Sequence, residues 1–180
     1  MKIEQNFSNY SAWHHRGRCL EALYQPITTI SLADLLANKP PDTGKQTSVI
    51  PLETLDLEFQ MVHSAFVTDP DDSSAWLYYR WLIAQLLKLT DPDTPDIIDM
   101  ERTLNNEIEF FQADLLQLDP ESKWILLTYA MLLEVNAKLQ EDVSDDGSEI
   151  YSKLMVVDPM RKGFYQDVKD GHASILMETI

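Results

Sequence analysis

The chain has 180 residues, of which 44% are hydrophobic and 24% charged, a composition that fits one globular domain and argues against wholesale disorder. Thirty acidic residues against 14 basic ones give a formal net charge of −16, which disfavours nucleic acid and anionic lipid as partners. No apolar run is long enough to span a bilayer, the first residues lack a signal peptide, and the single cysteine, Cys19, fits a reducing compartment, so we expect a cytoplasmic protein.

Apolar residues recur at spacings of three and four along most of the chain, which predicts an all-α fold. The stripes are Leu55, Phe59, Val62 and Phe66; Leu104, Ile108, Phe111 and Leu115; and Trp124, Leu127, Met131 and Val135. In chain order the predicted helices span about 10–24, 51–67, 73–89, 97–117, 121–138, 149–157 and 160–177, with a long loop at about 25–50. Residues 1–180 are expected to form a single helical-repeat domain of antiparallel hairpins.

Three of the predicted hairpins share one turn signal, an Asp-Pro pair between the two helices. The pairs are Asp69-Pro70, Asp119-Pro120 and Asp158-Pro159. Aspartate is a good N-cap and proline is tolerated at the first helical position, so the pattern predicts that each pair opens the second helix of its hairpin. A turn this short makes the two helices antiparallel neighbours.

Tryptophan occurs near the start of three predicted second helices, at Trp13, Trp76 and Trp124. The plain interpretation is core packing, because a tryptophan buries a large area. The first two share a Ser-Ala-Trp start and are followed by Arg16 and Arg80, which lie one helical turn further along the same face. Trp124 has no such arginine, so we expect it to serve packing only.

These residues resemble the repeat signature of protein prenyltransferase alpha subunits. The segment 9–16 (Asn-Tyr-Ser-Ala-Trp-His-His-Arg) carries the signature, and the segment 69–82 is similar to a late repeat of the alpha subunits of the Rab geranylgeranyltransferase type. Two further segments, 121–128 and 157–161, favour that type over the farnesyltransferase type. The resemblance covers nearly the whole chain in the right order.

The resemblance implies a crescent of helical hairpins whose concave face holds a prenyltransferase β subunit. That subunit would carry zinc and geranylgeranyl diphosphate, and the complex would transfer geranylgeranyl groups to C-terminal cysteines of Rab GTPases presented by a Rab escort protein. This chain would be a non-catalytic alpha subunit or a fragment of one, inactive alone. The implied partner-binding residues are Asn9, Tyr10, Trp13, Arg16, Trp76, Tyr79 and Arg80.

The sequence departs from the pattern of the family in three respects. Arg80 lies one residue further from its tryptophan than Arg16 does, and Ser73 stands where the first copy has Tyr10. Only eight residues precede the segment that begins at Asn9, so the helix that would pair with it is missing and we expect an N-terminally incomplete array. The alternatives are a free-standing tetratricopeptide-like adaptor and the alpha subunit of farnesyltransferase or type I geranylgeranyltransferase.

Neither a metal site nor a catalytic group is expected on this chain. His14 and His15 are adjacent on a helix and point about 100° apart, so they are poorly placed to share one ion. The acidic segment 142–147 starts like a calcium-binding loop, but its twelfth position is Lys153 instead of glutamate. Cys19 sits on a helix that also carries Trp13, which favours a packed, unreactive thiol.

Overall fold

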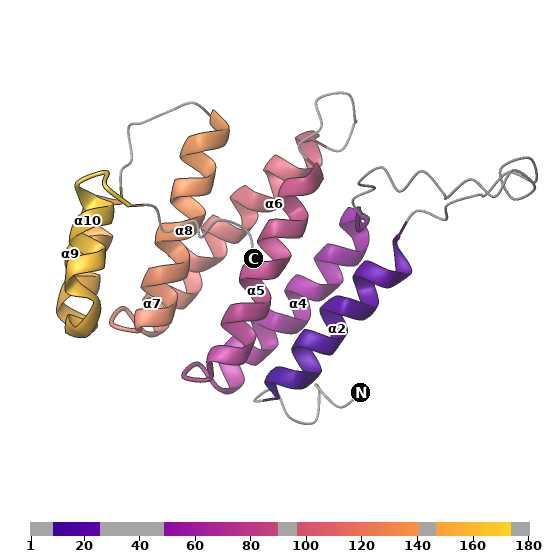
Figure 1. Cartoon of the computed structure of the whole chain (residues 1–180), viewed down its shortest axis with the longest axis horizontal. Helices are drawn as coiled ribbons and strands as arrows, with labels where there is room; N and C mark the ends of the chain where they lie inside the picture. The colour runs from indigo at the N-terminus through magenta and orange to yellow at the C-terminus, as the bar shows by residue number, and fades with distance from the viewer. Residues whose placement is uncertain (1–8, 26–48, 90–96, 141–146, 174–180) are drawn as a thin grey trace, which may run out of the picture.

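The computed structural model describes residues 9–25, 49–89, 97–140 and 147–173, shown as ribbons in Figure 1. Every regular element in these ranges is helical, which confirms the predicted all-α fold. The elements are α2 (Tyr10–Leu23), α4 (Leu52–Thr68), α5 (Ser73–Leu86), a 3-10 turn (Leu87–Leu89), α6 (Ile97–Phe110), a π-helical turn (Phe111–Leu115), α7 (Leu116–Leu118), α8 (Lys123–Gln140), α9 (Ser148–Val157), a 3-10 turn (Pro159–Arg161) and α10 (Lys162–Lys169). The predicted loop at 25–50 and the acidic segment at 142–147 lie almost entirely outside the described residues.

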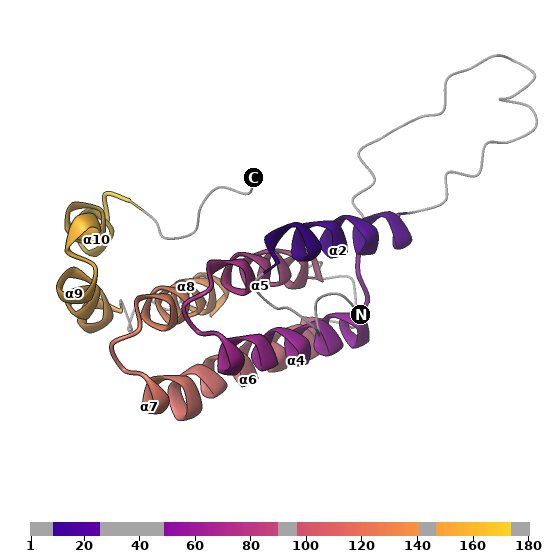
Figure 2. The ribbon, with the colours of Figure 1, turned by 90° about the horizontal axis from the view of Figure 1, so that it is seen from below.

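The helices form two layers that bend into a shallow arc. Figure 2 shows α2, α5, α8 and α10 along the inner side of the arc and α4, α6 and α9 along the outer side. Each hairpin packs on its neighbours: α4 packs on α5, α2 on α5, α6 on α8, and α9 on both α8 and α10. The inner side is therefore made of the second helices of successive hairpins, as expected for the crescent.

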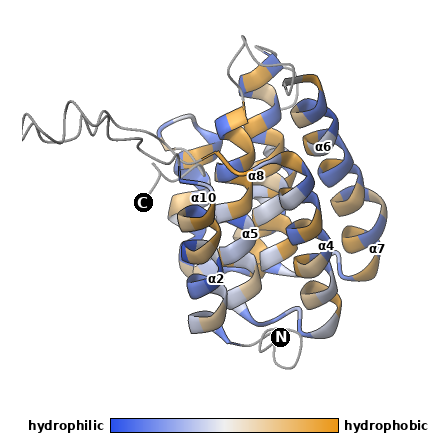
Figure 3. Cartoon of the chain, turned by 90° about the vertical axis from the view of Figure 1, so that its right-hand side faces the viewer, coloured by the Kyte–Doolittle hydropathy of each residue, from blue (hydrophilic) through white to orange (hydrophobic). Residues whose placement is uncertain are grey.

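The hydrophobic core lies between the two layers and contains buried side chains of α4, α5, α6 and α8. Figure 3 shows much of α8 in the apolar colour. All four residues of the α4 stripe are buried, with exposed fractions of 2% or less. The stripe predicted for α8 is only partly right, because Trp124 and Leu127 are half-buried whereas Ile125 and Leu126 are fully buried. Since α8 packs against α5, α6 and α9, more than one of its faces is covered.

Two of the three Asp-Pro pairs, Asp69-Pro70 and Asp119-Pro120, do not open the second helices, contrary to the prediction. The third does, because Asp158 is the N-cap of the 3-10 turn Pro159–Arg161 that leads directly into α10. Asp69, Asp119 and Asp158 are the C-caps of α4, α7 and α9, and their φ values lie between −128° and −147°. A residue before proline is driven out of the helical region, so each aspartate ends the first helix of its hairpin. The N-cap of α5 is Asp72, whose Oδ1 accepts a hydrogen bond from the Ser74 backbone N–H at 3.2 Å.

Each aspartate of the three hairpin pairs, Asp69-Pro70, Asp119-Pro120 and Asp158-Pro159, is followed, seven residues later, by a large buried side chain. These are Trp76, Leu126 and Tyr165, each exposed by only 1%. Trp76 donates from Nε1 to the Pro70 carbonyl at 2.9 Å, and Tyr165 donates to Asp158 at 2.8 Å, so both rings also close the turn before them. Leu126, and not Trp124, therefore occupies the position equivalent to Trp76.

The last helix is shorter than predicted. It ends at Lys169, whereas the sequence pattern placed the end near residue 177, and residues 174–180 lie outside the described part. Gly171 has φ of +74°, the His172 N–H bonds to the Asp167 carbonyl, and the Gly171 N–H bonds to that of Val168. This pair of bonds around a left-handed glycine is the Schellman motif, which terminates the helix.

Candidate partner-binding face

The first three predicted partner-binding residues lie at the start of α2. Asn9 caps the helix, because its Oδ1 accepts a hydrogen bond from the Ala12 N–H at 3.0 Å. Tyr10 is 56% exposed and stacks on His14 with ring centroids 6.1 Å apart. Trp13 is only 1% exposed and packs against Tyr78, 4.7 Å between ring centroids. Of the three, Tyr10 is the most accessible to a partner.

Trp76 and Tyr79 are buried in the middle of the array. Trp76 stacks on Phe66 with centroids 3.7 Å apart, and Tyr79 has no exposed surface. The Tyr79 hydroxyl donates to Glu107 on α6 at 2.8 Å, and burial together with the nearby Glu107 carboxylate raises the pKa of Tyr79 well above its ordinary value. Both side chains hold helices together, and a role in partner binding stays a prediction for them.

Arg16 is committed to an ion pair within the chain. Its Nε and Nη2 donate to the two carboxylate oxygens of Glu58 on α4, and Glu58 is only 2% exposed. Tyr78 donates to the same carboxylate at 2.8 Å. The hydrogen bond to Glu58 raises the pKa of Arg16, and burial raises that of Tyr78, so the cluster holds one anion and one cation and keeps a neutral phenol.

Glu107 on α6 repeats the arrangement of Glu58 on α4. Both follow a Thr-Leu pair by the same spacing, in Thr54-Leu55-Asp56-Leu57-Glu58 and Thr103-Leu104-Asn105-Asn106-Glu107. Each of the two glutamates accepts a hydrogen bond from the preceding second helix, Glu58 from Arg16 and Glu107 from Tyr79. Glu107 also lies 2.9 Å from Nε2 of His63. A buried carboxylate thus joins α4 to α2 and α6 to the α4–α5 hairpin.

This repeat shows which residues of α2 and α5 are equivalent. Arg16 and Tyr79 each lie three residues after their tryptophan, and each donates to the glutamate of the following outer helix. Arg80 lies one residue further on and is half-buried, and burial lowers its pKa. The structure therefore places Tyr79, and not Arg80, at the position of Arg16.

The exposed stripe of α5 contains two residues that the sequence motifs did not single out, Leu77 and Trp81. Leu77 is 45% exposed, and half-buried Trp81 packs its ring against Gly17 of α2, where an added Cβ would lie 3.4 Å from the ring. Trp81 also donates to Glu21 at 3.3 Å. Because α4 covers the outer side of α5, this stripe faces the inner side of the arc, together with Arg80. Leu77 and Trp81 are four residues apart, and this spacing could have predicted from the sequence that they lie on the same face of the helix.

The described residues show no grouping of three or more His, Cys, Asp or Glu side chains that could hold a metal ion. Cys19 is exposed instead of packed, with its Sγ 3.5 Å from Nε2 of His15, which corrects the expectation of a buried thiol. None of the helices in the described ranges is long and apolar enough to cross a bilayer.

The part of the chain that builds this face matches a known repeat. Residues 1–23 and 55–86 match the protein prenyltransferase alpha subunit repeat, and the second range covers most of the α4–α5 hairpin. The chain belongs to this repeat family, which confirms the resemblance drawn from the tryptophan motifs.

Similar proteins narrow the resemblance to one type of alpha subunit. The chain is 30% identical over 176 residues to the geranylgeranyl transferase type-2 subunit alpha of Schizosaccharomyces pombe, covering 93% of this chain and 47% of that protein. The protein of the same name from Saccharomyces cerevisiae is 25% identical over 173 residues, 96% of this chain and 47% of its own length. The human one is 40% identical over 83 residues, 46% of this chain and 12% of its own length. The chain spans about half the length of the yeast relatives.

Proposed function

We propose that this chain acts as an alpha subunit, or part of one, of a type-2 geranylgeranyltransferase and holds a catalytic β subunit against the inner side of its arc. The observation that carries the proposal is a coincidence of two features. The ranges that match the alpha subunit repeat are also those that supply Leu77, Arg80 and Trp81 to the inner face.

The chemistry of the inner face suits a protein interface. Trp and Arg are among the side chains that contribute most of the binding energy at such surfaces. Leu77 offers exposed apolar area, and half-buried Arg80 provides a guanidinium that burial has already taken partly out of water. A carboxylate on a partner would gain a strong, directional contact there.

The rest of the proposed reaction belongs to the partners. The β subunit would hold zinc and geranylgeranyl diphosphate, and an escort protein would present Rab GTPases, whose C-terminal cysteines receive the geranylgeranyl group. This chain would orient the β subunit and supply no reacting group, so we expect it to be inactive alone. The complex would work in the cytoplasm, where the exposed thiol of Cys19 stays reduced.

Co-expression tests the proposal directly. We expect the tagged chain to capture a type-2 β subunit, and the pair to transfer geranylgeranyl to a Rab in the presence of an escort protein. A farnesyltransferase β subunit, co-expressed separately, is the specificity control and should be captured poorly. Capture of neither β subunit would contradict the proposal and favour a free-standing adaptor, whereas preference for the farnesyltransferase β subunit would move the chain to that type.

A further inference from the structure

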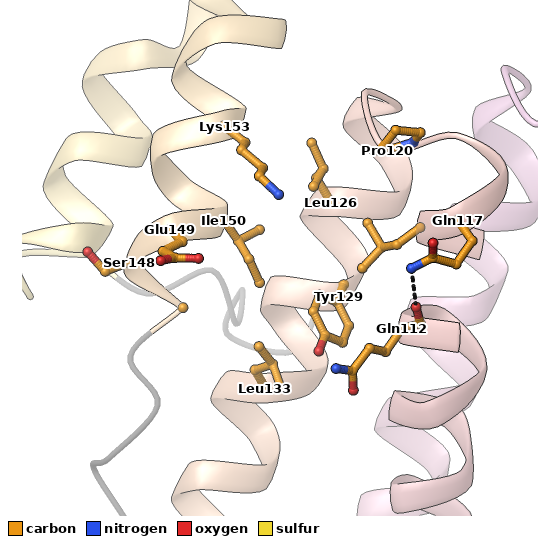
Figure 4. A pocket seen from close by; sticks show the side chains of 12 residues that line it. Gln112, Gln117, Pro120, Leu126, Tyr129, Leu133, Ser148, Glu149, Ile150 and Lys153 are labelled. Atoms are coloured by element: carbon orange, nitrogen blue, oxygen red, sulfur yellow. Dashed lines mark hydrogen bonds between the residues drawn. The ribbon is translucent and has the colours of Figure 1, made fainter. Parts of the chain in front are cut away.

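A groove lies on the outer side of α8, between α7 and α9. Its volume is about 670 Å³, within the range of about 300 to 1,000 Å³ that is usual for binding sites. Figure 4 shows Leu126, Tyr129 and Leu133 of α8 along the floor, with the end of the π-helical segment on one wall and α9 on the other. The groove is separate from the inner face, because it opens toward the outer layer of the arc.

The groove interrupts the regular packing of the outer helices. Where α4 and α6 pack together, they leave only a small polar hollow of about 250 Å³ between them. The segment from the Thr-Leu pair to the Asp-Pro pair is one residue longer in the second hairpin than in the first. The two Thr-Leu pairs lie 49 residues apart in the sequence, whereas the Asp-Pro pairs that follow them lie 50 apart. The π-helical turn after α6 accommodates this extra residue. π-helical turns of this kind often accompany functional sites. Gln112 and Leu116, in and after this turn, line the groove.

The lining combines an apolar floor with one lysine, Lys153, whose ammonium group points into the groove. Leu116, Tyr129 and Ile150 are half-buried, so their apolar surface is partly open to the groove. Figure 4 shows the Lys153 ammonium pointing into the groove, away from Glu149 one turn earlier on α9. A Glu-to-Lys pair at this spacing normally forms an ion pair on a helix. In the described part of the chain Lys153 has no hydrogen bond or ion pair, whereas Arg16, Arg102, Lys138 and Arg161 are ion-paired. Arg18 and Lys162 share this lack of a pair in the described part, but neither lines the groove.

We propose that this groove docks a segment of a partner protein that carries large apolar side chains next to a carboxylate. The apolar side chains would cover Leu116, Tyr129 and Ile150, and the carboxylate would pair with Lys153. On the opposite wall, Gln117 Nε2 donates to the Gln112 carbonyl at 3.5 Å, so the Gln112 side-chain amide and the Gln117 Oε1 would bond to the backbone of the segment. This inference does not depend on the proposed function, since it concerns the other side of the array.

Charge is the argument for an acidic occupant. On a chain of net charge −16, a carboxylate approaching most of the surface is repelled, whereas Lys153, which has no ion pair among the described residues, places a cation at the edge of the apolar floor. A basic segment would instead place its cation against Lys153, and Glu149 is the one carboxylate among the lining residues that could pair with it. The charge of Lys153 therefore favours an apolar segment with an acidic side chain over one with a basic side chain.

Backbone amide NMR with two blocked peptides tests the proposal, one being acetyl-Glu-Phe-Leu-Glu-amide and the other its Gln-for-Glu analogue. We expect the acidic peptide to shift the amide signals of Gln112, Tyr129 and Ile150 and to bind about threefold more tightly than the neutral one, as one exposed ion pair provides. Lys153→Gln should abolish that preference. Lys162→Gln removes an exposed lysine on α10, outside the groove, and should leave the preference unchanged.

Three results would overturn the proposal. The first is the absence of peptide-induced shifts in the groove, and the second is an equal loss of preference in Lys153→Gln and Lys162→Gln. The third is binding of the chain to vesicles of anionic phospholipid that Lys153→Gln abolishes, because the occupant would then be a lipid surface. Circular dichroism of each variant would verify that the helices are intact.

Discussion

The α4–α5 hairpin and the α9–α10 hairpin follow the same plan but are anchored very differently. Both turn at an Asp-Pro pair and bury a ring seven residues after the aspartate, Trp76 in one and Tyr165 in the other. Among the described residues, the α4–α5 hairpin is the one of the two that is clamped by a buried carboxylate, Glu58, which accepts hydrogen bonds from two helices. The α9–α10 hairpin instead leaves Met160 96% exposed. The comparison shows that the Asp-Pro turn and the buried ring are enough to form a hairpin, whereas buried polar contacts fix neighbouring hairpins to one another.

The largest expected effect comes from removing the clamp. Glu58→Leu leaves the Arg16 guanidinium and the Tyr78 hydroxyl without their acceptor, so the free energy of unfolding should fall by about 3 to 5 kcal/mol in urea denaturation. The double variant Arg16→Met, Glu58→Leu removes both charges and should recover much of the loss. Equal losses in the single and double variants would show that the pair does not act as a unit.

Alkaline pH should weaken both hairpins through their tyrosines. Burial raises the pKa of Tyr78 and Tyr79, and burial with the Asp158 hydrogen bond raises that of Tyr165 to about 12. Because the folded pKa values exceed the unfolded value of about 10, the stabilisation is complete below about pH 10 and is lost as the pH rises toward 12. Urea denaturation across this window measures the loss, and Tyr165→Phe should make it smaller. Stability that is flat up to pH 12 would contradict the burial of the phenols.

A smaller loss of stability should be confined to the α9–α10 hairpin at the end of the array. Tyr165→Phe removes one hydrogen bond to Asp158 and should cost about 1 kcal/mol. Amide hydrogen exchange should speed up in α9 and α10 and be unchanged in α4 and α5, since repeats contact only their neighbours. Faster exchange throughout the chain would mean that the array unfolds as one unit.

The smallest effect concerns two helical glycines. Gly163 of α10 has no atom within 4 Å of an added Cβ, so Gly163→Ala should gain about 0.5 to 1 kcal/mol from helix propensity. Gly17 of α2 faces Trp81 at 3.4 Å, so Gly17→Ala should gain less and Gly17→Leu should destabilise the chain. Thermal unfolding of the three variants measures the difference, and an equal gain for both alanines would show that the α2–α5 contact is loose.

The helices and the burial of Trp76 followed from the sequence because apolar periodicity and ring size are local properties. The glutamate clamps did not follow, since 30 acidic residues offered no reason to single out Glu58 or Glu107. The repeated Thr-Leu-x-x-Glu pattern was the available signal. The true equivalent of Arg16 was also hidden, because it is a tyrosine and only the contact with the next outer helix shows the match. Tertiary contacts, which sequence spacing does not encode, decided these points.

Binding of the β subunit to two surface variants tests the inner-face proposal most directly. Leu77 on α5 and Leu57 on α4 are 45% and 65% exposed, and they lie on the inner and outer layers. Leu77→Glu should weaken binding of a type-2 β subunit at least about tenfold, a loss of roughly 1.4 kcal/mol, whereas Leu57→Glu should bind like the unaltered chain. Unchanged binding by Leu77→Glu together with loss by Leu57→Glu would place the β subunit on the outer side and contradict the proposal.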